Sequence, residues 1–84
     1  MARRSPRFAR DAKQLGKHIR ALRKERGWTL EEASEKTQVA PKHLQKVESG
    51  VLNVTLVTLV RIAEGFGTSV RDLFPLLDPT PLPK

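Results

Sequence analysis

Residues 40–50, APKHLQKVESG, carry the side chains of this sequence whose types and spacing best suit binding chemistry. If the segment is helical, Leu44 and Val47 lie three residues apart on one side of the helix. The opposite side then carries two cations, an amide and a proline ring, namely Lys42, Lys46, Gln45 and Pro41. A solvated helix face usually mixes both signs of charge, so this acid-free face predicts an anionic partner.

The remaining polar residues form no pattern typical of an enzyme. His18 and His43 have no partner cluster at metal-ligand spacing, and the acids are scattered over helix faces that we expect to be exposed. The sequence has no cysteine and no glycine-rich phosphate-binding loop. We therefore expect no enzyme, no metal and no cofactor. Both histidines are interpreted as surface residues, of which His43 is also placed to contact a phosphate.

The positive charge is concentrated at the N-terminal end of the chain. Of 84 residues, 16 are Lys or Arg and 9 are Asp or Glu, which gives a formal charge of +7. Residues 1–26 hold ten of the cations and two of the acids, so the rest of the chain is nearly neutral. This distribution suits an arm or a first helix lying along phosphates. A flexible solubilising tail explains the arm cations equally well, namely Arg3, Arg4, Arg7 and Arg10.

Length and hydropathy indicate one small intracellular domain. The chain is long enough for a single modest core. The opening MARRSPRFAR is not followed by the apolar segment of a secretory signal. The longest apolar stretch, VLNVTLVTLV, is interrupted by polar residues and is far shorter than the roughly 20 residues that span a bilayer. We expect a cytoplasmic, nucleoid-associated protein without membrane contact.

Apolar spacing and capping signals predict the first three helices. The first follows the basic arm, with Leu15, Ile19 and Leu22 at helical spacing, and ends near Gly27. The TLEE that follows matches a reciprocal capping box and predicts a short second helix over about residues 30–37. A proline at the start of PKHLQKVES suits the first position of a third helix, because its missing N–H is not needed there.

The stretch 51–60 is ambiguous between a strand and a helix. Its alternating valines, leucines and threonines fit a strand, but a helix that begins after Thr55 aligns apolar residues beyond the point where alternation fails. We predict the helix, with an inward face of Leu56, Leu59, Ile62, Ala63 and Phe66. Ser69 and Asp72 predict a short fifth helix, and the proline-rich PLLDPTPLPK is not expected to form regular structure.

The order of these elements and several motifs resemble the lambda-repressor-like (XRE-type) helix-turn-helix family over residues 15–74. The most specific motifs are IRALRKERGWT, VESG and LNVTLVTLVRIAEGFG, and NVTL is especially similar to restriction-modification controller proteins. The resemblance implies an all-α, compact five-helix fold whose second and third helices are joined by the turn QVA. It also implies double-stranded DNA binding as a homodimer and a role in transcriptional control. Residues 1–12 would be the basic arm, 13–75 the DNA-binding domain and 76–84 a proline-rich tail.

The resemblance places base-reading positions at the start of the third helix, on Ala40, Pro41, Lys42 and Lys46, with Gln45 beside them. The two lysines are one turn apart and suit guanine O6 and N7 edges, whereas the proline ring offers only apolar contact, for example to a thymine methyl. The alternative is that both lysines contact only phosphate or solvent. The other DNA-binding candidates are His43, Ser49, Asn53, Arg3, Arg4, Arg7 and Arg10.

Three positions depart from the family pattern, and all three concern phosphate anchoring or the turn. Leu30 replaces the glutamine that usually opens the second helix. The loop after the third helix reads Val51 and Leu52 where a cation is usual. Gln38 replaces the turn glycine, so we expect it to adopt a left-handed conformation at a cost of about 1 kcal/mol.

Two further structural expectations concern the contacts of the first helix. The resemblance places Arg23 opposite Glu48, and we predict an ion pair between them that ties the third helix to the scaffold. Trp28 stands where the family has an aliphatic residue. We interpret it as a core residue that fills the space left by the small Ala33 and Thr37, in preference to a residue that stacks on bases.

Excess apolar surface near the C-terminal end predicts a two-fold homodimer interface made of Val57, Val60, Leu73, Phe74, Leu76 and Leu77. The rival interpretation is a protein-interaction module of the same fold that binds a partner protein through Val51 and Leu52. RNA binding is the weaker third option, because the chain lacks an aromatic platform for stacking single-stranded bases.

Overall fold

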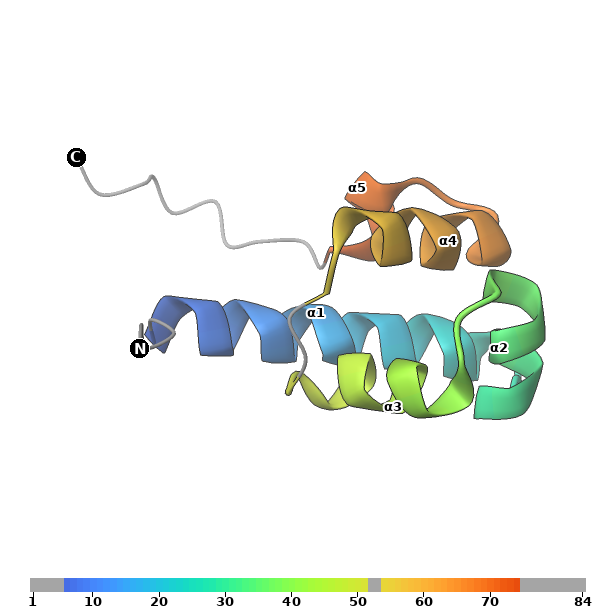
Figure 1. The fold of residues 1–84 in the computed structure, drawn as a ribbon, viewed down its shortest axis with the longest axis horizontal. Coiled ribbons are helices and arrows are strands. Elements are labelled where there is room, and N and C mark those ends of the chain that lie inside the picture. Colours follow the sequence, from blue (N-terminus) through green and yellow to red (C-terminus); the bar gives the residue numbers. More distant parts are fainter. Residues whose placement is uncertain (1–5, 52–53, 75–84) are drawn as a thin grey trace.

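The computed structural model describes residues 6–51 and 54–74, and all regular structure in them is helical. The helices are α1 (Pro6–Glu25), α2 (Leu30–Thr37), α3 (Pro41–Ser49), α4 (Leu56–Phe66) and α5 (Val70–Leu73). In Figure 1 the long α1 runs between α3 on one side and α4 with α5 on the other, while α2 closes one end. The predicted all-α, five-helix fold is confirmed.

Short local signals define where three of the helices begin. The Glu32 N–H donates to the Thr29 hydroxyl over 3.1 Å, and the Thr29 N–H donates to the Glu32 carboxylate over 2.8 Å, which is the predicted capping box of α2. The hydroxyls of Thr55 and Ser69 accept backbone N–H bonds at the starts of α4 and α5. Such a cap satisfies an otherwise unpaired N–H, which favours the helix over the strand considered for residues 51–60.

The core takes residues from all five helices and from the turn between α2 and α3. Its buried apolar residues are Leu15, Ile19, Ala33, Val39, Leu44, Val47, Ile62, Ala63, Phe66 and Leu73. The inward face predicted for α4 is correct for its last two turns but wrong at Leu56, which is 68% exposed. Leu56 is the first residue of α4, and the helix reaches the core only at Leu59, one turn later.

Trp28 packs against this core, as predicted. Its ring meets the Phe66 ring edge-on, with 5.6 Å between centroids. The Arg26 guanidinium lies 5.0 Å from the centroid of the Phe66 ring and donates to the Phe66 carbonyl over 2.7 Å. These contacts join the C-terminal end of α1 to the C-terminal end of α4.

Two glycines allow pairs of helices to approach closely. A Cβ on Gly16 would collide with the backbone carbonyls of Val47 and Glu48, so α1 lies directly against the C-terminal turn of α3. A Cβ on Gly65 would lie 2.5 Å from the Lys36 carbonyl oxygen, which brings α4 equally close to α2. Only a residue without a side chain fits at either crossing. The crossing at Gly16 fixes the position of α3.

Helix α1 begins earlier than predicted. Residues 1–12 were expected to form an arm, but residues 6–12 are helical. Pro6 suits the first helical position, and neither glycine nor a further proline interrupts the chain between it and Leu15. The remaining arm residues, including Arg3 and Arg4, lie outside the described residues, as does the expected tail over 76–84.

Candidate nucleic-acid interface

The outward face of α3 is polar. Leu44 and Val47 point into the core, with 1% and 2% of their surface exposed. The exposed residues at this helix are Ala40, Lys42, Gln45, Lys46 and Ser49, with Pro41 and His43 half-buried. Ala40 provides no side-chain cap for the first turn of α3. The polar face predicted from the spacing of Leu44 and Val47 is therefore present on the outer side of α3.

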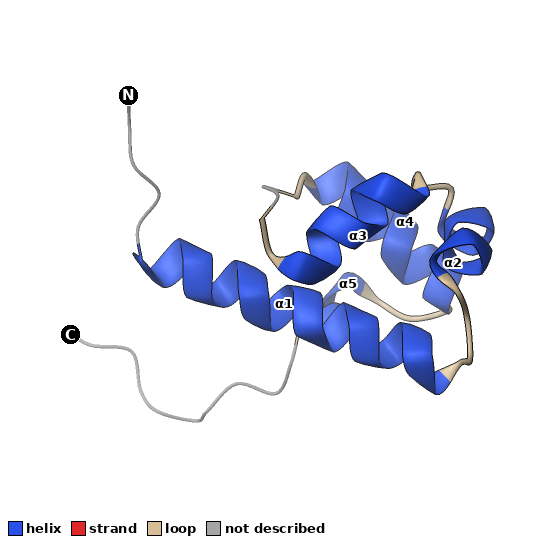
Figure 2. Ribbon diagram, turned by 90° about the horizontal axis from the view of Figure 1, so that it is seen from below, coloured by secondary structure: helices blue, strands red, loops and turns tan. Residues whose placement is uncertain are grey.

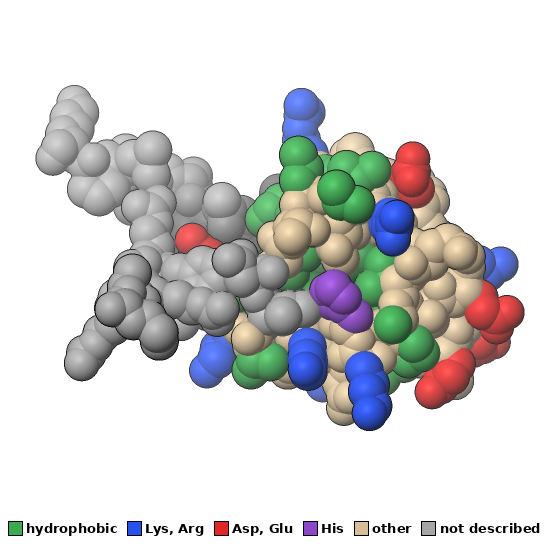
Figure 3. All heavy atoms as spheres, viewed as in Figure 1, with side chains coloured by type: hydrophobic (Ala, Val, Ile, Leu, Met, Phe, Trp, Pro, Cys, Tyr) green, Lys and Arg blue, Asp and Glu red, His purple; other side chains and the backbone are tan. Residues whose placement is uncertain are grey.

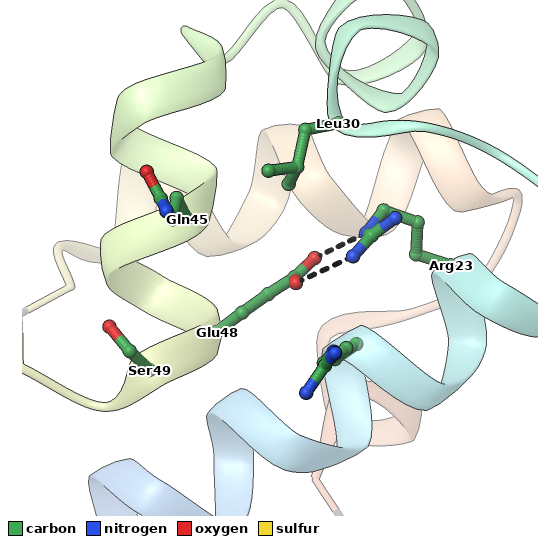
Figure 4. Close-up of a pocket in the computed structure, with 6 residues that line it drawn as sticks. Arg23, Leu30, Gln45, Glu48 and Ser49 are labelled. Carbon is green, nitrogen blue, oxygen red and sulfur yellow. Dashed lines mark hydrogen bonds and ion pairs between the residues drawn. The ribbon is translucent and has the colours of Figure 1, made fainter.

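Glu48 is the only acid of α3, and Arg23 of α1 holds it. Arg23 Nε donates to Glu48 Oε2 over 2.7 Å, and Nη2 donates to Oε1 over 3.0 Å; Figure 4 shows this bidentate pair between the two helices. Arg23 Nη1 also donates to the Trp28 carbonyl over 2.8 Å. The hydrogen bond from Glu48 is the main cause of the raised pKa of Arg23, with burial acting against it.

This bidentate contact is the ion pair that the resemblance implied. Only 11% of the Arg23 side chain and 7% of the Glu48 side chain are exposed. Because the carboxylate is turned toward α1 and neutralised there, the outward face of α3 presents lysine charge without an opposing acid.

A depression of about 260 Å³ lies beside this ion pair, between α1 and α3. Its lining residues are Arg20, Arg23, Leu30, Gln45, Glu48 and Ser49. In Figure 4, Gln45 and Ser49 extend from α3 next to this depression, and Leu30 reaches it from α2. Arg20 is absent from the predicted site. The available sequence signal is its position one turn before Arg23 on the same helix.

Charge is distributed unevenly around the molecule. Figure 3 shows Lys and Arg side chains along the edge formed by α1 and α3, and acidic side chains gathered toward α2. The exposed acids of α2 are Glu31, Glu32 and Glu35. The edge formed by α1 and α3 is therefore the better surface for an anion.

The departures from the family pattern have visible structural consequences. Gln38 has φ 61° and ψ 31°, the left-handed conformation that we predicted. Leu30 is half-buried against the core, so the first residue of α2 presents no polar side chain to a partner. Val51, the second residue after α3, is 60% exposed.

One predicted interface residue is wrong. Leu73 was expected at a dimer surface, but it is fully buried. Because α5 is a single turn, its inward side covers the core with Leu73 and leaves Phe74, the residue after the helix, 44% exposed. Val57 and Val60 are 62% and 39% exposed, as a surface patch requires.

The structure places only part of the predicted basic arm. Arg10 is exposed on α1, and Arg7 lies in the first turns of the same helix. The other predicted residues lie outside the described part of the chain: Arg3, Arg4, Leu52, Asn53, Leu76 and Leu77.

Residues 6–51 and 54–74 contain no cluster of three His, Asp or Glu side chains arranged to hold a metal ion. No helix in the same residues has the length and apolar character needed to cross a membrane. His18, expected at the surface, is half-buried on α1, with its Nε2 3.1 Å from the Asp72 carbonyl oxygen.

Comparison with known families decides what this arrangement represents. A helix-turn-helix family model, HTH_3, matches residues 19–73, which include α2, α3 and α4 complete. The chain belongs to the HTH_3 helix-turn-helix family. The resemblance inferred from the sequence motifs is therefore confirmed. HTH_3 proteins are DNA-binding transcriptional regulators and not enzymes. Both properties were expected from the sequence, namely DNA binding with a role in transcriptional control and no enzymatic activity.

Individual HTH_3 proteins are similar over most of this chain. An uncharacterised HTH-type transcriptional regulator, y4dJ of Sinorhizobium fredii, is 33% identical over 69 residues, which are 82% of this chain and 90% of that protein. The restriction-modification controller protein C.AhdI of Aeromonas hydrophila superposes with a TM-score of 0.74 at 28% identity, covering 77% of this chain and 98% of that one. An HTH_3 family transcriptional regulator from Vibrio cholerae gives a TM-score of 0.75 at 29% identity; the match covers 79% of this chain but only 37% of that one.

Proposed function

We propose that this HTH_3 protein is a sequence-specific regulator that binds double-stranded DNA as a homodimer, with α3 in the major groove. The observation that carries the proposal is the composition of α3. Its two large apolar residues are buried, its only acid is paired with Arg23, and its outward face carries Lys42, Gln45 and Lys46. An α-helix fits the major groove, where such side chains meet base edges.

Each outward residue of α3 has a distinct expected role. Lys42 and Lys46 lie one turn apart and donate to guanine O6 and N7. The Gln45 amide suits adenine, which presents one acceptor and one donor in the major groove. Pro41 contacts apolar groups such as a thymine methyl. Ser49, exposed, and His43, half-buried, are the expected phosphate contacts of α3.

The exposed apolar surface of α4 supports the homodimer. Val57, Val60 and Phe74 remain exposed after Leu73 is assigned to the core, and Leu56 adds to the same end of α4. Figure 3 shows hydrophobic side chains gathered over the α4 and α5 side of the molecule. A two-fold interface there would present two α3 helices about 34 Å apart, one helical turn of DNA.

The exposed Val51 favours a second candidate function, a protein-interaction module on the same fold. In that case the apolar residues after α3 would dock on a partner protein, and α3 would bind duplexes weakly. Salt dependence separates the two candidates, because DNA binding releases counterions and weakens steeply as salt increases. An interaction module would show little duplex affinity even at low salt.

The experiment selects bound duplexes from a random pool and then compares variants on the selected and random sequences. Lys42→Ala and Lys46→Ala should each cost about 1 to 3 kcal/mol on the selected duplex and less on random duplex, because a bidentate base contact discriminates between sequences. Arg61→Ala, which removes an exposed cation from α4, is the matched control and should affect neither.

Equal losses on selected and random DNA would show that the two lysines only anchor the protein. Specificity would then have to come from Gln45, Pro41 or the shape of the DNA. Failure of the pool to yield any preferred sequence would reject sequence-specific binding itself and favour the interaction module.

A further inference from the structure

One side of α1 carries a row of cations to which the proposed role of α3 gives no function. The row consists of Arg10, Lys13, Lys17, Arg20 and Lys24, and all five side chains are exposed. Their spacing of three and four residues places them on one side of a helix. We call this row the α1 cationic stripe. Over 14 residues at 1.5 Å each, it extends about 21 Å.

The α1 cationic stripe is unfavourable for the isolated helix. Lys13 with Lys17, and Arg20 with Lys24, are like charges four residues apart, which repel each other. Asp11 and Glu25 lie on another side of the helix by the same rotation, so no acid interrupts the stripe. In the described part of the chain, none of the five cations is ion-paired with another described residue. The C-terminal end of the helix dipole favours Lys24 alone.

The stripe lies next to the outward face of α3. Arg20 lines the depression that Gln45 and Ser49 also line, so the stripe meets α3 at its fourth cation. Farther along, a Cβ on Gly50 would lie 2.7 Å from the Lys13 Cα, which places α1 directly against the residue that ends α3. Figure 2 shows α3 beside α1, with α4 lying behind α3.

We infer that the α1 cationic stripe binds the phosphates of duplex DNA beside the groove that α3 enters. This inference rests on the proposed function and deepens it, because it names the anchors of this particular chain. The first turn of α2 carries Glu31 and Glu32, and α3 is followed by Gly50 and the apolar Val51, so neither segment supplies a cation. The repulsion within the stripe is relieved when phosphates come between its cations.

A membrane surface fits the stripe less well than DNA. A helix that lies on a membrane buries an apolar face in the lipid. The apolar face of α1 is already occupied, because Leu15 and Ile19 are in the protein core.

The test measures the salt dependence of binding to a random-sequence duplex of about three helical turns, which reports phosphate contacts without base readout. The variant Lys13→Gln with Lys17→Gln keeps helix-forming residues of similar length. The control Arg61→Gln with Arg71→Gln removes two exposed cations from α4 and α5 and makes the same change in net charge. Circular dichroism verifies that both remain folded.

The expected result is that the α1 variant lowers the log-log salt slope by about 1.8, or 0.9 for each lost phosphate contact, on random and selected duplexes alike. The control should change the slope by less than half as much. An α1 variant with the slope of the unmodified protein overturns the inference and leaves the proposed function standing. A loss confined to the selected duplex overturns it too, because it would place these lysines at base edges. Loss of binding to phosphatidylserine vesicles with an unchanged DNA slope would assign the stripe to a lipid surface instead.

Discussion

Gln38 shows how a single backbone angle constrains the helix-turn-helix. It is the residue after α2, with φ 61°, and its backbone N–H donates to the Ser34 carbonyl over 2.8 Å. Its side-chain amide donates to the Glu35 carbonyl over 2.9 Å, which compensates part of the strain. Gln38 is the only described non-glycine residue with positive φ. The turn therefore has glutamine in the left-handed conformation that glycine usually supplies at this position.

Gln38→Gly should stabilise the protein by about 0.5 to 1 kcal/mol in denaturant unfolding. Glycine adopts positive φ without a Cβ clash, and this gain exceeds the loss of an exposed side-chain hydrogen bond and the greater freedom of the unfolded chain. Gln38→Ala is the control. It keeps the strain and loses the hydrogen bond, so it should be less stable than the unmodified protein. A glycine variant no more stable than the alanine variant would show that the strain is negligible.

Glu48→Ala should cost about 3 kcal/mol of unfolding free energy and should also weaken DNA binding. The substitution leaves the Arg23 guanidinium charged, largely buried and without its carboxylate. Glu35→Ala removes an exposed acid from α2 and serves as the control for charge alone. A melting temperature unchanged in Glu48→Ala would count against a structural role for the pair.

The contribution of Arg23 in this pair to the free energy of unfolding should not depend on pH near neutrality. Its pKa is raised above the ordinary guanidinium value by the hydrogen bond to Glu48. A raised pKa contributes stability that is fully present below the unfolded-state pKa and is lost only as the pH rises through the folded-state pKa. Both lie far above neutral pH, so the Arg23 contribution should be constant between about pH 6 and pH 9. The difference in unfolding free energy between Arg23→Met and the unmodified protein, followed across this pH range, measures that contribution.

At the scale of helices, the position of α3 depends on how closely α1 can approach it. The carbonyls of Val47 and Glu48 occupy the space where a Cβ on Gly16 would be. The contact involves the backbone of Glu48, the partner of Arg23, and lies one turn from Arg20 along α1. The residues proposed to touch DNA from α1 and from α3 are therefore held in one fixed relation by a backbone contact.

Gly16→Ala should displace α3 from α1, cost about 2 kcal/mol of stability and reduce DNA affinity. Gly27→Ala is the matched control, because a Cβ at that position meets no atom within 4 Å and only its φ of 69° is unfavourable. Both variants should lose stability, but only Gly16→Ala should lose more affinity than its stability loss explains. A Gly16→Ala protein with normal DNA binding would show that α3 tolerates the displacement.

At the scale of the whole molecule, the two proposed surfaces lie on opposite sides. The α1 and α3 edge carries the α1 cationic stripe and the lysines of α3, and the apolar residues of α4 gather on the other side of α1 (Figures 1 and 3). One protein can therefore contact DNA and a second copy at the same time, since neither surface covers the other.

Val57→Lys combined with Val60→Lys should convert the proposed dimer to a monomer that remains folded, because both side chains are exposed in the single chain. Val51→Lys changes an exposed valine outside this patch and is the control. Sedimentation of the three proteins at micromolar concentration, free and on DNA, measures the effect. An unmodified protein that sediments as a monomer under both conditions would reject the homodimer.

Much of the fold was predictable because its signals are local. A capping hydroxyl, the Thr29 and Glu32 box and the glycine that ends a helix act within one turn, so their residues alone determine where helices begin and end. The polar face of α3 was predictable for the same reason, since Leu44 and Val47 define its inward side by helical rotation. The family assignment followed from motifs of the same kind.

Other features were decided only when the helices packed together. Leu56 and Leu73 both fit an apolar face in the sequence, yet one is exposed and the other is fully buried. The difference depends on whether another helix lies opposite, and no periodicity within one helix contains that information. The same holds for the position of Arg20 beside α3, whereas the spacing of the α1 cationic stripe is readable in the sequence and only its nearness to α3 is not. The sequence by itself determined that α1 is basic and α3 amphipathic, but the approach of α1 to α3 at Gly16 decided that their exposed faces form one surface, because that contact joins residues about 30 positions apart in the chain.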